Sequence, residues 1–311
     1  MPRIKSLLSA LPDDYSLTLA DIGSAGGLQD RWGPVSQRVN ALLFEPRDCA
    51  DGPTQDGRNR IFPVALGAAA GTATLNVTKM VNMSSLRQPN MALLQQIRKK
   101  CHQGAVVSQQ TVAIDSLDAL LEREQLQVDA LKIDTQGTEL EILTGAQEAL
   151  RRSVVLAEVE ISFIERYLGQ ATGATLISWM QERDFQLIEI YRLKRYRHLN
   201  SCDIKNVGIG GGNRAGQLAF ADAVFALTSD GFMRRRRLLS RDAAGRSLLS
   251  MLVSLVVYGK IDMAAAWFDQ HGDLLDPPLQ AALRHWFGGW RRAHIVRGGL
   301  HHVADYIARK V

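Results

Sequence analysis

The sequence predicts a mixed α/β fold, in which a doubly wound, mainly parallel sheet is followed by a small helical appendage. Two patterns support this prediction. Between residues 16 and 229, short apolar segments alternate with segments of helical periodicity. Such alternation is typical of βαβ units, whose strands are covered by helices on both faces. After Gly231 the strand-like segments end, and only helical patterns follow.

The predicted main strands are short and almost wholly apolar, as expected of strands buried on both faces. They are Leu17–Ile22, Val39–Phe44, Arg60–Val64, Val128–Ile133, Val154–Val159 and Phe185–Tyr191. Gln217–Leu227 is predicted as a final strand. Gly71–Thr78 and Ala105–Ala113 instead alternate like exposed strands, and we interpret them as an insertion between the third and fourth main strands, near the site.

Helical periodicity predicts one helix over Thr138–Leu150 and three in the C-terminal region, interrupted by Pro277-Pro278. The C-terminal three are Ser247–Tyr258, Ile261–Asp269 and Leu279–Trp290. We therefore expect one domain over residues 1–230 and a helical appendage over residues 231–311. The appendage is the candidate surface for assembly into a homo-oligomer.

Composition places the chain among ordinary globular proteins, with 311 residues, 46% of them hydrophobic and 22% charged. The three cysteines, Cys49, Cys101 and Cys202, form no CxxC pair, which argues against a zinc site or a disulfide framework and suits a reducing cytosol. The longest apolar run, Ser247–Tyr258, is too short to span a bilayer. The sequence thus predicts a cytoplasmic protein without a membrane span or a metal.

Two segments concentrate positive charge in a chain whose net charge is only +5. One is Arg234–Arg237, and the other runs from Arg192 to His198. Runs of this kind are usually solvated faces. The functional alternative is a docking surface for an acidic or phosphorylated substrate, or for nucleic acid.

A glycine-rich turn follows the first predicted strand in the segment Leu19–Gly27. Its spacing is not GxGxxG, because only Gly23 and Gly26 stand at a G-x-x-G interval, with Ser24 between them and Asp21 before them. Glycine lets the backbone approach a ligand closely, and in a doubly wound sheet this turn lies at the edge where ligands bind. The alternative is a purely structural strand-to-helix turn.

An acidic residue, Glu45, ends the second predicted strand about twenty residues after the glycine turn. A carboxylate at this position can accept hydrogen bonds from both ribose hydroxyls of a nucleotide-like ligand. The alternative is a strand-end acid that faces water. Because the two motifs occur in this order, they favour a ribose-containing cofactor more strongly together than either does alone.

The longest motif is Asp129–Ala146, in which a buried strand carries Lys132, ends at Asp134 and turns through Gln136-Gly137 into an acidic helix start. A charged residue inside so apolar a strand is costly unless it is paired or used. We expect Asp134 to lie beside the first glycine turn at the edge of the sheet.

This stretch resembles the LKID-x-x-G-x-E-x-x-x-L-x-G-A pattern of the FkbM-type methyltransferase family. Weaker matches to other motifs of that family occur in the expected order, and the resemblance covers residues 18–191. They are Asp21–Gly26, Phe44–Pro46, Ala65–Gly67, Ser84–Leu86 and Ala157–Glu160. Ser24-Ala25 departs from the alanine and asparagine more common in the family, which affects side-chain contacts in the turn but not the turn itself.

The resemblance implies a Rossmann-like class I fold, S-adenosyl-L-methionine as methyl donor and usually an O-methyl product on a hydroxyl of a sugar, glycolipid or polyketide-like molecule. The residues it assigns to the cofactor are Asp21, Gly23, Ser24 and Gly26 on the methionyl side, Glu45 at the ribose, and Val64 and Ala65 near the adenine. It places Asp134 between cofactor and acceptor.

A neutral hydroxyl must lose its proton during methyl transfer, so a nearby base assists the reaction. Asp134 is the first candidate and Glu160, on the next strand, the second, because strand ends at this edge face the ligand. The alternative role for Asp134 is to hold the cofactor or the strand that carries Lys132. Glu158 is expected to have a structural partner, and Trp32 suits either an acceptor pocket or plain packing.

Three other readings remain open at this point. A nucleic-acid methyltransferase would use the arginine clusters, but the sequence lacks an Asn/Asp-Pro-Pro-aromatic motif and a Pro-Cys nucleophile, and only 6% of residues are aromatic. A catalytically silent binding or assembly protein would not need acids at both strand ends. A nicotinamide dehydrogenase is disfavoured by the glycine spacing. We therefore expect a small-molecule or glycan acceptor and no stable nucleic-acid partner.

Overall fold

The computed structural model describes residues 4–24, 29–46, 53–204 and 215–290. Its contacts divide the chain into two compact units. The larger unit comprises residues 18–28 and 40–235, and the smaller one residues 1–17, 29–39 and 236–311. The division of the chain at residue 230 stays a prediction.

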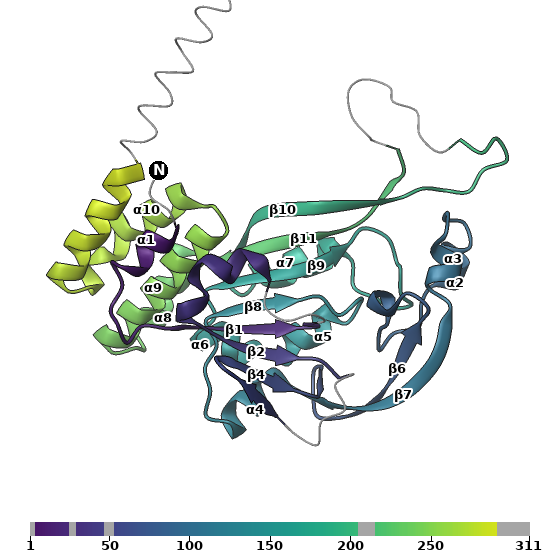
Figure 1. The fold of residues 1–311 in the computed structure, drawn as a ribbon, viewed down its shortest axis with the longest axis horizontal. Coiled ribbons are helices and arrows are strands. Elements are labelled where there is room, and N and C mark those ends of the chain that lie inside the picture. Colours follow the sequence, from purple (N-terminus) through teal and green to yellow (C-terminus); the bar gives the residue numbers. More distant parts are fainter. Residues whose placement is uncertain (1–3, 25–28, 47–52, 205–214, 291–311) are drawn as a thin grey trace, which may run out of the picture. The chain divides into compact units, whose positions relative to one another are not determined.

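The larger unit is built on a mixed eight-stranded sheet of order β10-β11-β9-β8-β1-β2-β4-β3 (Figure 1). Its strands are β1 (Leu17–Ile22), β2 (Val39–Phe44), β3 (Thr54–Asp56), β4 (Asn59–Phe62), β8 (Ala130–Ile133), β9 (Leu156–Ser162), β10 (Phe185–Tyr196) and β11 (Gln217–Leu227). The mixed α/β fold is thus confirmed, and β1, β2 and β11 have the predicted bounds.

Parallel pairing dominates the middle of this sheet, and antiparallel pairing its edges. β1 pairs in parallel with β8, β8 with β9, and β2 with β4. β11 is antiparallel to both β9 and β10, and β3 is antiparallel to β4. From β1 the chain continues on one side to β2 and β4, and later on the other side to β8 and β9. The strand order therefore reverses at β1 and β8, which is where α/β sheets bind ligands.

The central strands form because their side chains are apolar on both faces. Every residue of β8 and β9 is buried, including the charged Lys132, Glu158 and Glu160. The three charged side chains lie on one face, because Lys132 stands opposite Glu158 in register and Glu160 follows two residues later. Burial of these charges marks the carboxyl ends of β8 and β9 as the unusual part of an otherwise apolar sheet.

Helices connect the strands of the larger unit. They are α4 (Leu117–Arg123), α5 (Glu139–Thr144), α6 (Gln147–Arg152), α7 (Gly173–Gln181) and α8 (Ser229–Arg236). The single helix predicted over residues 138–150 is wrong, because the chain breaks it into α5 and α6 at Gly145. A Cβ at Gly145 would overlap the carbonyl oxygen of Gly67, so the backbone there packs too closely for any other residue.

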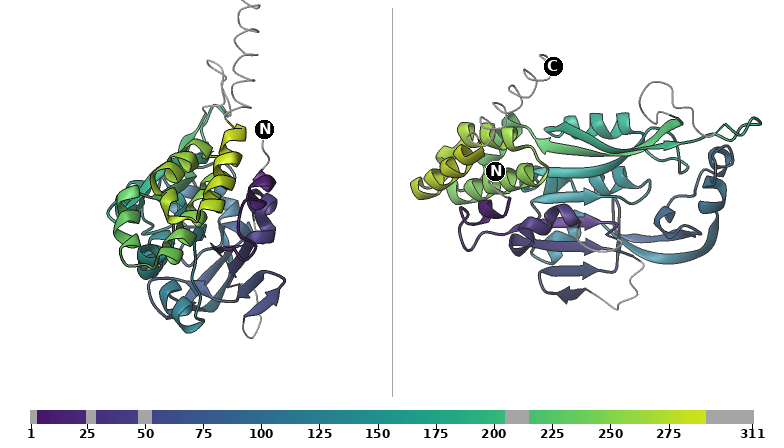
Figure 2. Two further views of the ribbon diagram at one scale, coloured as in Figure 1. Left: turned by 90° about the vertical axis from the view of Figure 1, so that its left-hand side faces the viewer. Right: turned by 45° about the horizontal axis from the view of Figure 1, so that its top comes forward.

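The predicted insertion forms a second sheet of order β5-β7-β6, made of β5 (Ala65–Leu66), β6 (Gly71–Thr78) and β7 (Val106–Asp115). Between β6 and β7 lie η2 (Val81–Met83), α2 (Met91–Leu94) and α3 (Lys100–Gln103). Figure 2 shows β6 and β7 extending past the strands of the main sheet.

The smaller unit is helical. It contains α1 (Ile4–Leu8), η1 (Asp30–Arg38), α9 (Arg241–Val257), α10 (Ile261–His271), η3 (Gly272–Leu274) and a helix over 277–290. Trp32 of η1 is buried there and packs edge-on against Tyr258, with ring centroids 6.1 Å apart. The packing role considered for Trp32 is therefore the observed one. Among the described residues, none of the helices is both long enough and apolar enough to cross a bilayer.

Candidate functional site

A buried ion pair joins the ends of β1 and β8. Asp21 stands opposite Lys132 in register, and Asp21 Oδ1 lies 3.1 Å from Lys132 Nζ. Burial raises the pKa of Asp21, and Lys132 opposes this effect. Burial lowers the pKa of Lys132, but the carboxylates of Asp21, Asp134 and Glu158 outweigh it and raise that pKa overall. Lys132 is therefore paired with an acid, as is required of a charged residue in so apolar a strand.

The turn after β1 is fixed to its neighbours by backbone contacts. Gly23 has a φ of +82°, and a Cβ there would overlap the carbonyl oxygen of Asp134. Gly23 N donates to Phe44 O (3.0 Å), and Lys132 Nζ donates to Gly23 O (3.4 Å). Glycine is therefore required at position 23 for close packing of two turns. Ser24 is buried beside it, and Gly26 lies outside the described residues.

The other predicted cofactor residues follow β2 and β4. Glu45 is buried directly after β2, and its N–H donates to Phe62 O (3.2 Å). Val64 is half-buried, whereas Ala65 is buried and begins β5. The strands β1, β2, β4 and β8 end at one edge of the sheet. This edge therefore carries the predicted site residues at the ends of these strands, which are Asp21, Glu45, Val64, Ala65 and Asp134. Their roles toward a cofactor stay predictions.

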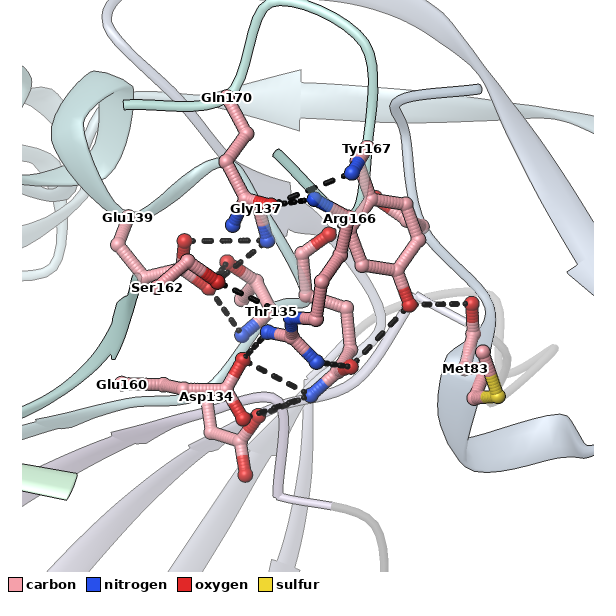
Figure 3. A network of polar contacts seen from close by, with 12 residues as sticks. Met83, Asp134, Thr135, Gly137, Glu139, Glu160, Ser162, Arg166, Tyr167 and Gln170 are labelled. Carbon is pink, nitrogen blue, oxygen red and sulfur yellow. Dashed lines mark hydrogen bonds and ion pairs between the residues drawn. The ribbon is translucent and has the colours of Figure 1, made fainter. Parts of the chain in front are cut away.

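The turn after β8 is braced from inside by a helix-start acid. Glu139 is buried, and its carboxylate accepts hydrogen bonds from the backbone N–H groups of Thr135 (3.1 Å) and Gly137 (3.0 Å) (Figure 3). Burial raises the pKa of Glu139, and the backbone donors oppose this effect. Glu139, an acid of the predicted acidic helix start, thus holds the Asp134–Gly137 turn in shape.

One amide bridges the two candidate bases. Gln136 has a φ of +62°, and its Nε2 donates to Asp134 Oδ1 (2.7 Å) and to Glu160 Oε2 (3.2 Å). Its Oε1 accepts from Arg166 Nη1 (3.2 Å) and from Tyr167 Oη (3.2 Å). The structure therefore brings Asp134 and Glu160 together, as the sequence predicted, and adds Gln136, which sequence reasoning missed.

Arg166 is the second residue that sequence reasoning missed. It is fully buried, forms an ion pair with Glu160 and donates through Nε to Ser162 Oγ (3.0 Å). Burial raises the pKa of Glu160, Arg166 opposes it, and the Asp134 and Glu139 carboxylates add to it. Glu160 is thus already engaged by a guanidinium and an amide, whereas Asp134 is only half-buried.

The insertion contacts this turn directly. Ser85 Oγ donates to Gln136 O (2.8 Å), and Arg87 Nε donates to Gly137 O (2.8 Å). Tyr167 Oη donates to Met83 O (2.9 Å). The expectation that the insertion lies near the predicted site is therefore confirmed, and Ser85 acts there as a brace of the turn.

The Arg234–Arg237 cluster is largely structural where its contacts are described. Arg235 is buried and donates through Nη2 to Leu150 O (2.7 Å) and Val154 O (2.8 Å), so it caps the end of α6. Burial lowers its pKa to about 10. Arg234 forms an ion pair with Asp184.

His198 contacts Gln217 on the surface (3.1 Å). Among the described residues, no group of three or more His, Cys, Asp or Glu side chains forms a metal cluster.

Known protein families share features of this chain, namely the order of its motifs, the buried turn after β8 and the acidic helix start. Residues 35–187 match the model of the methyltransferase FkbM domain. These residues, just under half of the chain, resemble the FkbM methyltransferase family. The FkbM match includes Glu45, Asp134 and Glu160 and begins after the Gly23 turn. The resemblance inferred from the motifs is thereby confirmed.

Among solved structures, the chain is similar to methyltransferase FkbM from Methylobacillus flagellatus KT, with a TM-score of 0.33 and 12% sequence identity. The similarity covers 72% of this chain and 48% of that one, so the chain spans about half the length of that structure. Comparison with curated proteins gives no significant match.

Proposed function

We propose that the chain is an S-adenosyl-L-methionine-dependent methyltransferase with a doubly wound class I sheet, and that it O-methylates a hydroxyl of a small-molecule or glycan acceptor. One observation carries the proposal: Glu45 and the Gly23 turn lie at the tips of neighbouring strands where the strand order reverses. Ligands of α/β sheets bind at this point, and an acid after the second strand suits a ribose.

The residues at this edge fit the parts of such a cofactor. Glu45 would hold the ribose hydroxyls, and Val64 with Ala65 would lie along the adenine. Asp21 is nearly inaccessible, with 1% of its surface exposed, and it is paired with Lys132. Asp21 therefore serves the methionyl end indirectly, by holding Lys132, which in turn donates to the Gly23 carbonyl oxygen. When bound, the cofactor supplies a methyl group that its sulfonium has already activated.

The chain's own contribution to the reaction is alignment and proton removal. An acceptor oxygen must be held in line with the methyl group at near-attack distance, with water excluded. Asp134 is the base in this proposal, because it is the half-buried carboxylate of the pair and Gln136 orients its Oδ1 (2.7 Å). Glu160 and Arg166 act through Gln136 as positioning residues.

Calorimetric titration of the full chain with S-adenosylmethionine and with its demethylated product tests the proposal. We expect both to bind, and Glu45→Gln to weaken binding by about 1–3 kcal/mol, since hydrogen bonds to a charged group are lost. Glu122→Gln, at an exposed acid on α4, is the matched control and should leave binding unchanged. Absence of heat with both compounds would instead support a silent binding protein.

A further inference from the structure

One end of the larger unit collects positive charge. We define this basic end as residues 79–107 and 192–204, which include η2, α2, α3 and the outer part of β10. It contains nine Lys and Arg residues and a single acid, Asp203, whereas the whole chain has a net charge of only +5. The remainder of the chain is therefore net acidic, and the charge is segregated rather than spread over the surface.

The two segments of the basic end are joined although they are distant in the sequence. Arg98 N donates to Arg197 O (2.9 Å), and Leu199 N donates to Gln96 O (2.7 Å). Ile97 forms an isolated antiparallel bridge with His198, which follows β10. Figure 1 shows α2 and α3 beyond the ends of the main strands, near the outer part of β10. The two segments thus lie side by side at this end of the larger unit.

The lysines of this surface lack acidic partners among the described residues. Lys100 is half-buried with its Nζ 4.9 Å from the centre of the Tyr196 ring. Burial lowers the pKa of Lys100, and the neighbouring charges that add to this effect are Arg166 and Lys194, both positive. The lysines without a carboxylate partner in the described parts of the chain are Lys79, Lys99, Lys100 and Lys194. Such a cluster attracts anions.

Exposed aliphatic side chains accompany these cations. Eleven large apolar side chains are exposed among the described residues, and seven of them lie in the basic end. They are Met80, Val81, Val106, Val107, Leu193, Leu199 and Ile204. Exposed apolar residues scattered singly are normal, but concentration at one end marks an interaction site. None of the seven is aromatic.

We propose that the basic end docks the protein on the surface of an anionic lipid bilayer. Aliphatic side chains inserted at the headgroup boundary, with lysines that contact anionic lipids, are the combination that holds proteins on membrane surfaces. Single-stranded nucleic acid would favour exposed aromatic side chains for stacking, which the seven apolar residues do not supply. A second copy of the chain would bring like charges together. This inference does not depend on the proposed methyl transfer.

Vesicle sedimentation tests the proposal with the full chain. We expect binding to vesicles of phosphatidylcholine mixed with phosphatidylglycerol and little binding to phosphatidylcholine alone. Neutralising Lys79, Lys99 and Lys194 to Gln should lower the partition coefficient roughly fivefold per lysine. The double substitution Val107→Ser with Leu199→Ser should lower it roughly tenfold, because less apolar surface enters the interface.

The matched control is Arg237→Gln with Leu238→Ser, an exposed cation and an exposed apolar residue of the smaller unit. It should bind vesicles like the unchanged protein. Equal binding to both vesicle types, or equal losses in control and basic-end variants, overturns the proposal. Binding to single-stranded RNA without binding to vesicles also overturns it. The same holds if the protein does not bind vesicles but forms a dimer that Leu199→Ser dissociates. Competition by soluble glycerol phosphate at low concentration would indicate a free-phosphate site instead of a bilayer.

Discussion

Lys132 holds Asp21 and the following glycine turn at the same time: its Nζ lies 3.1 Å from Asp21 Oδ1 and 3.4 Å from Gly23 O. The ammonium group therefore ties the end of β8 to the end of β1 and to the turn at the proposed cofactor site. A buried pair of this kind is costly to break, because the remaining partner is left as an uncompensated charge.

Replacement of Lys132 tests this relationship. Lys132→Met should lower the free energy of unfolding by about 3–5 kcal/mol, because Asp21 loses its counter-charge in a buried position. Adding Asp21→Asn should recover much of the loss, since the uncompensated charge is then removed. Urea unfolding of the two single variants and the double variant measures this coupling. Additive losses would show that the two side chains do not depend on each other.

The close approach of two turns makes a second prediction. Gly23→Ala should destabilise the protein by at least about 2 kcal/mol more than Gly57→Ala. Both glycines have positive φ, but an added Cβ overlaps Asp134 O at Gly23 and meets nothing within 4 Å at Gly57. Urea unfolding of the two variants separates the effect of the Cβ overlap from the effect of backbone strain, because both variants are strained and only Gly23→Ala has the overlap. Similar losses at both positions would contradict the close packing.

Asp222 on β11 predicts a pH dependence of stability. Burial raises its pKa from 3.8 to about 6, with Glu158 and Asp134 adding to the effect and Arg192 opposing it. The folded state therefore holds this proton more tightly than the unfolded state. The contribution to stability is present below pH 3.8 and is lost as pH rises through 6, by about 3 kcal/mol in total.

Asp222→Asn removes this titration. The variant should resemble the unchanged protein near pH 4 and should exceed it in stability above pH 7, because no buried carboxylate has to ionise. Unfolding free energies measured across that pH range give the comparison. An identical pH profile in the two proteins would show that the pKa of Asp222 is the same in the folded and unfolded states.

Asp134 and Glu160 are distinguished by their partners. Under the proposed function, Asp134→Asn should lower kcat by about a hundredfold or more, as expected for loss of a general base. Affinity for the demethylated cofactor should change little. Glu160→Gln leaves Arg166 without its counter-charge and should lower stability as well as turnover. Methyl-transfer kinetics and urea unfolding of both variants test this; full activity of Asp134→Asn removes it as the base.

Continuous apolar runs located the buried strands β1 and β2, and exposed alternation located β6 in the insertion. These three strands and β11 have the predicted bounds. The need of Lys132 for a partner followed from its apolar surroundings. Gln136 was missed because its contacts with Glu160 and Arg166 join residues 24 and 30 positions apart. Arg166 was missed because no local sequence pattern reports its burial. The close approach of Gly145 to Gly67 O, where the helix breaks, also joins residues far apart in the sequence.

A crystal structure of the full chain with the demethylated cofactor bound tests the proposed cofactor site. We expect electron density for the ribose at Glu45 and for the methionyl end along the backbone of Gly23 and Ser24, with the Asp21–Lys132 pair intact beneath. Density for the compound elsewhere on the chain, with Glu45 making no contact to it, would contradict the proposed site.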